Sequence, residues 1–195
     1  VRREARDFEL GPEGPIRLRT DNGDLDLDVV VVAAGVWSAR LAVRLGSRVP
    51  LETERGYHVT IAHPGVLPRC PIMAGERKFG ATPMEGGLRL AGTAEFGGLS
   101  APPNYARARV LLEHGRRMLP GLDTSAFSEW MGHRPALPDS LPVIGPAPRY
   151  RSAFFAFGHG HTGLTGAPMT GRVIADLVAG RPPSIDIAPF RMDRF

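Results

Sequence analysis

The 195 residues are 43% hydrophobic and 23% charged, without an apolar run near the roughly 20 residues of a membrane-spanning helix. The net charge of +4 comes from arginine, because Lys78 is the only lysine, and the charges are dispersed. Dispersed charge argues against a nucleic-acid-binding surface. The single cysteine, Cys70, excludes a disulfide framework and a multi-cysteine metal site, and it is compatible with a reducing, cytoplasmic setting.

The first quarter of the chain carries the signals of a hairpin and then of a buried strand. Two alternating runs flank the turn sequence Asp21-Asn22-Gly23, which predicts a β-hairpin. Residues 29–34 are continuously apolar and mostly β-branched, which is typical of a strand buried on both faces. Gly35 ends this run, either to make a tight turn or to let a ligand approach closely, and a short helix is expected over 37–45.

The rest of the chain mixes strands with isolated helices. Strands are predicted from apolar or alternating runs at 51–61, 88–93, 127–131, 141–144 and 153–157. Helices are predicted over 105–119, where apolar residues recur with helical spacing, and in the segment that ends at Ala179. This order indicates a mixed α/β (α+β) fold with a largely antiparallel sheet.

A glycine-rich segment, Gly158 to Gly163, follows an apolar strand and precedes a helix. Its glycines leave backbone N–H groups open, and the helix adds the positive end of its dipole. The segment therefore predicts a site for an anion or for an electron-rich edge of a ligand. It lacks the spacing of a pyrophosphate-binding loop, and a plain strand-to-helix connection is the alternative.

Arg134 lies between a predicted strand and a proline-rich turn. A guanidinium fixed there could hold a carboxylate through two hydrogen bonds, whereas an ordinary ion-paired arginine is the alternative. His133, His159 and His161 could ligate zinc, but no acidic ligand accompanies them at a familiar spacing, so we expect no metal. No G-x-S-x-G motif supports a hydrolase.

The order of five blocks resembles the D-amino-acid oxidase-like family of FAD-dependent oxidoreductases, and within it the bacterial D-amino-acid dehydrogenases. Glycine oxidase and sarcosine oxidase are relatives of that branch, and the sequence resembles them less. The blocks are VVVAAGVWS (30–38), ERGYH (54–58), GLRLAGTAE (87–95), the segment 130–145 and FGHGHTGLT (157–165).

The resemblance implies two interleaved domains. Residues 1–46 and 141–195 would be C-terminal parts of an FAD-binding domain of the glutathione-reductase type. Residues 47–140 would be part of a substrate domain whose antiparallel sheet covers the flavin. The family's N-terminal glycine-rich dinucleotide loop is absent from this sequence, and the sequence begins without an initiator methionine or a signal core, so we expect a C-terminal fragment whose partner is the missing N-terminal part.

The resemblance also assigns residues. Ala34 and Gly35 would lie near the diphosphate and ribose of FAD. The flavin's pyrimidine edge would lie against Gly160, His161, Thr162, Gly163 and Leu164. Arg134 would pair with the substrate carboxylate, and Tyr57 and His58 would line the substrate side. No catalytic residue is assigned.

The implied activity is oxidation of the C–N bond of an amino acid, a D-amino acid in first place, by hydride transfer to flavin N5. The alternatives are a secondary-amine substrate (a cyclic or N-methyl amino acid) and a non-catalytic subunit or remnant of a flavoprotein. We expect the fragment alone to be inactive and prone to self-association. Its expected location is the cytoplasm, with peripheral association with the inner membrane as a variant.

Overall fold

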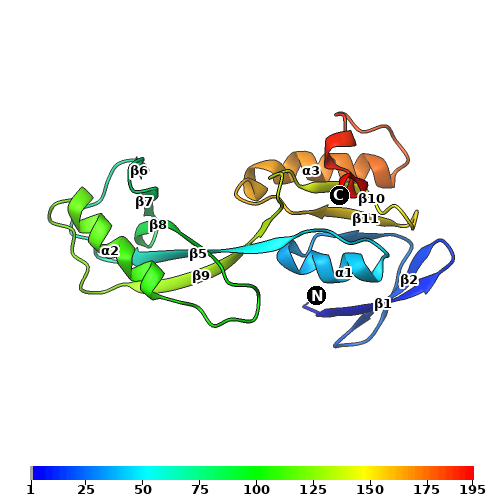
Figure 1. The fold of residues 1–195 in the computed structure, drawn as a ribbon, viewed down its shortest axis with the longest axis horizontal. Helices are drawn as coiled ribbons and strands as arrows, with labels where there is room; N and C mark the ends of the chain where they lie inside the picture. The colour runs from blue at the N-terminus through cyan, green and yellow to red at the C-terminus, as the bar shows by residue number, and fades with distance from the viewer. Residues whose placement is uncertain (1) are drawn as a thin grey trace. The chain divides into compact units, whose positions relative to one another are not determined.

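The computed structural model describes residues 2–195 and divides the chain into two compact units (Figure 1). The first unit combines Val1–Glu52 with Arg134–Phe195, and the second is Thr53–His133. The sequence-based boundaries were at 46/47 and 140/141. The assignment of one unit to FAD and of the other to the substrate stays a prediction.

A three-stranded antiparallel sheet opens the first unit, in the order β1-β2-β3. Its strands are β1 (Ala5–Gly11), β2 (Gly14–Thr20) and β3 (Leu25–Asp26). The predicted hairpin is confirmed, because Leu18 of β2 lies opposite Leu25 of β3 across the Asp21-Asn22-Gly23 turn. Strand β1, which sequence reasoning missed, pairs with the other edge of β2.

The second sheet of this unit has the order β10-β11-β4. Its strands are β4 (Val30–Val32), β10 (Val143–Pro146) and β11 (Ala153–Phe157), and β11 runs parallel to β4 and antiparallel to β10. Val32 is 2% exposed but Val31 is 39% exposed. The expectation of a strand buried on both faces is therefore wrong for the described residues, because Val31 borders an open hollow between β4 and α3.

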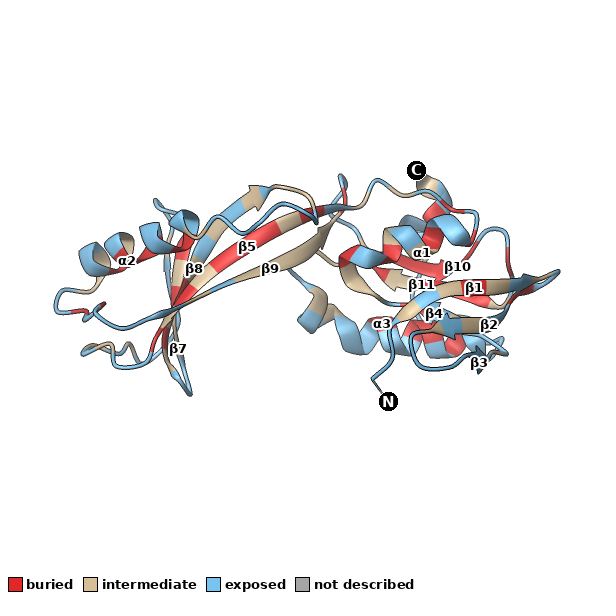
Figure 2. Ribbon diagram, turned by 90° about the horizontal axis from the view of Figure 1, so that it is seen from below, coloured by how far each residue is buried: buried red, intermediate tan, exposed pale blue. Residues whose placement is uncertain are grey.

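Helices cover both faces of this second sheet (Figure 2). Phe155 packs in one core cluster with residues of α1 (Ser38–Arg44), which follows the 3-10 turn Gly35–Trp37. Phe154 points the other way and packs against α3 (Gly163–Val178). The chain then ends in two short 3-10 turns, Ala188–Phe190 and Met192–Arg194.

The second unit is built on a five-stranded sheet of order β6-β7-β8-β5-β9. The bounds are β5 (Glu52–Ile61), β6 (Ile72–Ala74), β7 (Phe79–Met84), β8 (Gly87–Phe96) and β9 (Ser128–Ala136). Strands β6, β7, β8 and β5 pair antiparallel in succession, which confirms the largely antiparallel sheet.

Helix α2 (Ala106–Met118) packs on one face of this sheet. Tyr57, Val59 and Ile61 of β5 form a core with α2, and each is at most 1% exposed. His58 and Thr60, which alternate with Val59 and Ile61, are only half-buried and point to the opposite face of the sheet. No helix among residues 2–195 has the length and apolarity needed to cross a membrane.

Candidate functional site

The two predicted cofactor segments lie beyond the carboxyl ends of two neighbouring strands, β4 and β11, of the β10-β11-β4 sheet. Strands β4 and β11 are parallel, with Val32 opposite Phe155, so their carboxyl ends lie side by side. The segment Ala34-Gly35 follows one strand and the segment Gly158–Gly163 follows the other. Ligands of parallel α/β sheets bind at this kind of edge, beyond the carboxyl ends of the strands.

Gly35 and Gly160 have left-handed backbones, with φ of +57° and +53°, and a Cβ built on either meets no atom within 4 Å. The space above both residues is open. Gly158 differs, because a Cβ there would lie 2.5 Å from Cδ1 of Leu137. Packing therefore explains Gly158, whereas the open space at Gly35 and Gly160 leaves room for a ligand to approach the backbone.

The turn from His159 to Thr162 leads into α3. Both the backbone N–H and the hydroxyl of Thr162 donate to the carbonyl of His159, each at 3.0 Å. Nε2 of His159 lies 2.9 Å from the hydroxyl of Thr170, and burial lowers the pKa of this histidine below its ordinary value. His159 thus anchors the turn to α3, while Leu164 at the start of α3 is 93% exposed.

This turn presents the amino end of a 16-residue helix at the sheet edge. The first N–H groups of a helix have no partner within it and carry partial positive charge. No side-chain cap occupies the start of α3. His161 and Thr162 are exposed there beside Gly163. Within residues 2–195 no cluster of three or more His, Cys, Asp or Glu side chains could hold a metal ion.

A hollow of about 370 Å³ lies between α3 and the β4 side of the sheet. Its lining is mostly apolar and includes Val31, Ala33, Ala156, Gly163 and Ile174. The hollow adjoins the edge strand β4, so it could accept apolar groups beside the glycine-rich segment.

Arg134 lies inside β9 and not between a strand and a turn, as the sequence had suggested. The strand continues through Pro135, whose carbonyl accepts a hydrogen bond of 3.0 Å from the N–H of Gly160. Proline cannot donate to a neighbouring strand but its carbonyl remains available. The residue after Arg134 is therefore tied directly to the glycine-rich segment.

Tyr57 and His58 are adjacent on β5, so their side chains point to opposite faces of the sheet. Tyr57 is 1% exposed on the α2 side, where its ring meets that of Tyr105 edge to face at 6.3 Å. His58, on the other face, stacks on Trp130 with ring centroids 4.8 Å apart and planes 22° apart. Burial and then the charge of Arg89 lower the pKa of His58, which favours the neutral imidazole.

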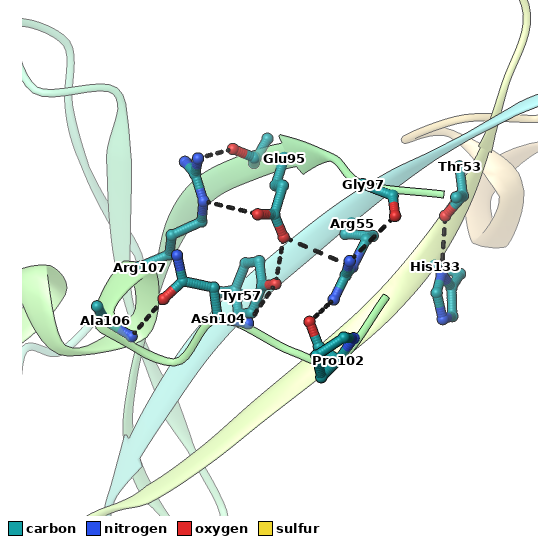
Figure 3. A network of polar contacts seen from close by, with 11 residues as sticks. Thr53, Arg55, Tyr57, Glu95, Gly97, Pro102, Asn104, Ala106, Arg107 and His133 are labelled. Atoms are coloured by element: carbon teal, nitrogen blue, oxygen red, sulfur yellow. Dashed lines mark hydrogen bonds and ion pairs between the residues drawn. The ribbon is translucent and has the colours of Figure 1, made fainter. Parts of the chain in front are cut away.

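A buried polar network surrounds Tyr57 (Figure 3). Its hydroxyl donates to Oε2 of Glu95 at 2.5 Å and accepts from the N–H of Asn104 at 3.1 Å. Arg55, also 1% exposed, donates to the carbonyls of Gly97 and Pro102 at 3.3 and 2.7 Å, and its Nε lies 3.6 Å from Oε2 of Glu95.

Sequence reasoning missed this network and the position of Arg89. The alternation of side chains along β5 could have revealed the burial of Arg55. Arg55 is an even number of residues from Val59 and Ile61, so it points to the same buried face. The network occupies the hydroxyl of Tyr57 on the α2 side. The expectation that Tyr57 lines the substrate side stays a prediction, as do those for His58 and Arg134.

The chain matches the family described as FAD dependent oxidoreductase over residues 1–177. It belongs to this family. It is 44% identical to a D-amino-acid oxidase of Bradyrhizobium diazoefficiens over 199 residues, which cover 100% of this chain and 47% of that relative. It is 39% identical to a D-amino acid dehydrogenase of Paramagnetospirillum magneticum, with 91% of this chain and 43% of that relative covered.

The fold is likewise similar to a solved glycine oxidase from Geobacillus kaustophilus. The TM-score is 0.85 at 28% identity, and the match covers 99% of this chain and 52% of that one. The chain thus spans about half the length of these relatives. Its own residues fit the family's cofactor, because two open glycines and a helix amino end converge where parallel strands finish.

Proposed function

We propose that this chain is the C-terminal half of a flavoenzyme that oxidises the C–N bond of an amino acid, a D-amino acid in first place. The observation that carries the proposal is the hydrogen bond from Gly160 to Pro135. It joins the segment suited to the cofactor with the strand that carries Arg134, a residue suited to a carboxylate. An amino-acid oxidase needs both functions close together.

The flavin, when bound, supplies the acceptor for the hydride that leaves the carbon beside the amine. The amino end of α3, with the N–H groups of Gly163 and Leu164, would stabilise negative charge at the edge of the ring system, while the N–H groups of Gly160 and Thr162 bond to the carbonyls of Pro135 and His159. Ala34 has a small side chain and Gly35 has none, so both would leave room for the diphosphate to approach the backbone at the end of β4. Arg134 holds the substrate carboxylate through its two-pronged guanidinium, and His58 contributes an uncharged surface.

A secondary-amine substrate, such as a cyclic or N-methyl amino acid, is the second candidate within the same chemistry. A non-catalytic flavoprotein subunit is the candidate from another class. Both candidates are compatible with the geometry of the glycine-rich segment. They differ in activity, because the first predicts turnover of secondary amines and the second predicts none.

The test uses the full-length protein with its N-terminal half. We expect a yellow protein that reduces an artificial dye with D-amino acids faster than with their L-enantiomers. Greater activity with proline or sarcosine than with D-alanine would establish the secondary-amine reading instead. A protein that contains flavin but oxidises neither D-amino acids nor secondary amines would be a non-catalytic subunit. A colourless protein would contradict the proposal, because it would contain no flavin.

A further inference from the structure

Arg89 of β8 lies on the face of the five-stranded sheet opposite α2. Its neighbours in the strand, Leu88 and Leu90, are fully buried in the core with α2, so alternation directs Arg89 to the other face. The register of the paired strands places Arg89 between Thr60 of β5 and Thr82 of β7. The residues directly beside this arginine in the sheet are therefore uncharged.

The guanidinium of Arg89 has no anionic partner among residues 2–195. The side chain is only partly exposed, and its Nε is buried without a hydrogen-bond partner. No carboxylate in this part of the chain forms an ion pair with it. Partly desolvating a guanidinium without an anion is unfavourable, so the position is suited to an anion that a ligand supplies.

An aromatic surface adjoins Arg89 on the same face. His58 lies opposite Ala91 and is therefore a diagonal neighbour of Arg89, about 7 Å away between Cβ atoms. Its ring stacks on Trp130 of β9 with centroids 4.8 Å apart, and Trp130 is 53% exposed. Burial and then the charge of Arg89 lower the pKa of His58, which favours the neutral imidazole. The surface beside the cation is thus flat and uncharged.

Gly132 determines how the indole of Trp130 lies on this face. A Cβ built on Gly132 would come within 1.9 Å of Cη2 of Trp130. The indole therefore occupies the space that a side chain at position 132 would fill, and it lies along β9. Because the ring is held both by His58 and by this contact with the backbone, a ligand that packs on it has little side-chain motion to restrict.

We propose that this face binds a small monocarboxylate with an aromatic ring, its carboxylate on Arg89 and its ring on the Trp130–His58 pair. A single cation matches a single negative charge, and a planar guanidinium can hold a carboxylate through two hydrogen bonds. The exposed aromatic pair matches a ring at the other end of the ligand. These residues all belong to the unit Thr53–His133, so the site goes beyond the proposed function and does not depend on it.

The test is calorimetric titration of the full-length protein with 3-phenylpropionate and with 3-phenylpropionamide, which has the same shape and no charge. Every protein carries Arg134→Ala, so that the carboxylate position of the proposed function does not contribute. We expect saturable binding of the acid and at least about 10-fold weaker binding of the amide. Adding Arg89→Met should weaken binding of the acid by about 10- to 100-fold, and Arg89→Lys should restore part of the loss.

The aromatic half of the site is tested on the same protein. Trp130→Ala should weaken binding of 3-phenylpropionate by about 10-fold, whereas Trp130→Phe should keep most of the affinity because a ring remains. The matched control is Arg116→Met, on the exposed face of α2, which should bind the acid unchanged.

Equal binding of acid and amide, no saturable binding of either, or unchanged binding in Arg89→Met would overturn the proposal. Urea unfolding without ligand is the second measurement. Because Arg89 has no partner to lose, Arg89→Met should keep or raise the urea midpoint, and a lower midpoint would overturn the proposal by giving Arg89 a structural role. Binding of the acid by a protein that contains no flavin would support this site even though the proposed function had failed.

Discussion

The hydroxyl of Tyr57 donates a 2.5 Å hydrogen bond to Oε2 of Glu95 across the paired strands β5 and β8. The same hydroxyl accepts from the N–H of Asn104, in the segment that leads into α2. One side chain thus ties together two strands and the approach to the helix (Figure 3). His58 takes no part in this network, because it points to the opposite face of the sheet.

Tyr57→Phe should destabilise the protein by about 1–2 kcal/mol, because the N–H of Asn104 loses its acceptor in a buried network. The change is measured as a lower urea midpoint with an unchanged slope. Tyr105→Phe is the control, since that neighbouring ring contacts Tyr57 but its hydroxyl is outside the network. Similar losses in both variants would show that the hydroxyl of Tyr57 contributes nothing specific.

Stability should fall in acid partly through Glu95. The hydrogen bond from Tyr57, then the charges of Arg55 and Arg107, outweigh desolvation and lower the pKa of this carboxyl in the folded state. A lowered pKa stabilises the fold above the carboxyl's unfolded pKa, near 4.5, and the contribution is lost as pH falls through the folded value.

The stability difference between wild type and Glu95→Gln should therefore be largest at neutral pH and shrink between about pH 5 and pH 3. Urea unfolding at several pH values measures it. Glu85→Gln, in the exposed turn between β7 and β8, should show no such trend. A gap between wild type and Glu95→Gln that stays constant with pH would contradict the assignment.

Gly160→Ala should weaken FAD binding by the full-length protein by about tenfold. The left-handed backbone costs a non-glycine residue about 1–2 kcal/mol, and the methyl group would project into the open space above Gly160, where the proposed cofactor would approach. Flavin content after dialysis and a fluorescence titration measure the effect. Gly23→Ala, at an equally open left-handed position in the β2–β3 hairpin, should lose stability but keep its FAD.

The 195-residue chain by itself should bind FAD weakly and be inactive. In the proposed enzyme most contacts to the adenine and ribose come from the N-terminal half, and only the glycine-rich edge belongs to this chain. Quenching of flavin fluorescence on titration is the measurement. Stoichiometric, submicromolar binding would show that the cofactor site lies elsewhere.

Arg134→Ala in the full-length enzyme should raise KM for a D-amino acid by about 10- to 100-fold and leave the FAD content unchanged. Arg134→Lys should recover only part of the affinity, because an ammonium cannot form the paired hydrogen bonds of a guanidinium. Steady-state kinetics with an artificial dye measure both variants. If neither KM changes, Arg134 is not in the site, and an uncharged amine becomes the better substrate class.

Local signals in the sequence were sufficient for several elements. The Asp21-Asn22-Gly23 turn predicted its hairpin, and the apolar run before Gly35 predicted β4, because turn chemistry and branched side chains act over a few residues. The order of the motifs also identified the family and hence the fold class.

Only the tertiary structure showed that β4 is an edge strand, that β9 runs on through Arg134 to Pro135, and that Pro135 bonds to Gly160. It also showed that the side chains of Tyr57 and His58 lie on opposite faces of their sheet. These outcomes depend on which strands pair and which face α2 covers, and such contacts join residues far apart in the chain. The sequence determined which groups the protein carries, whereas long-range pairing and packing decided which of them meet.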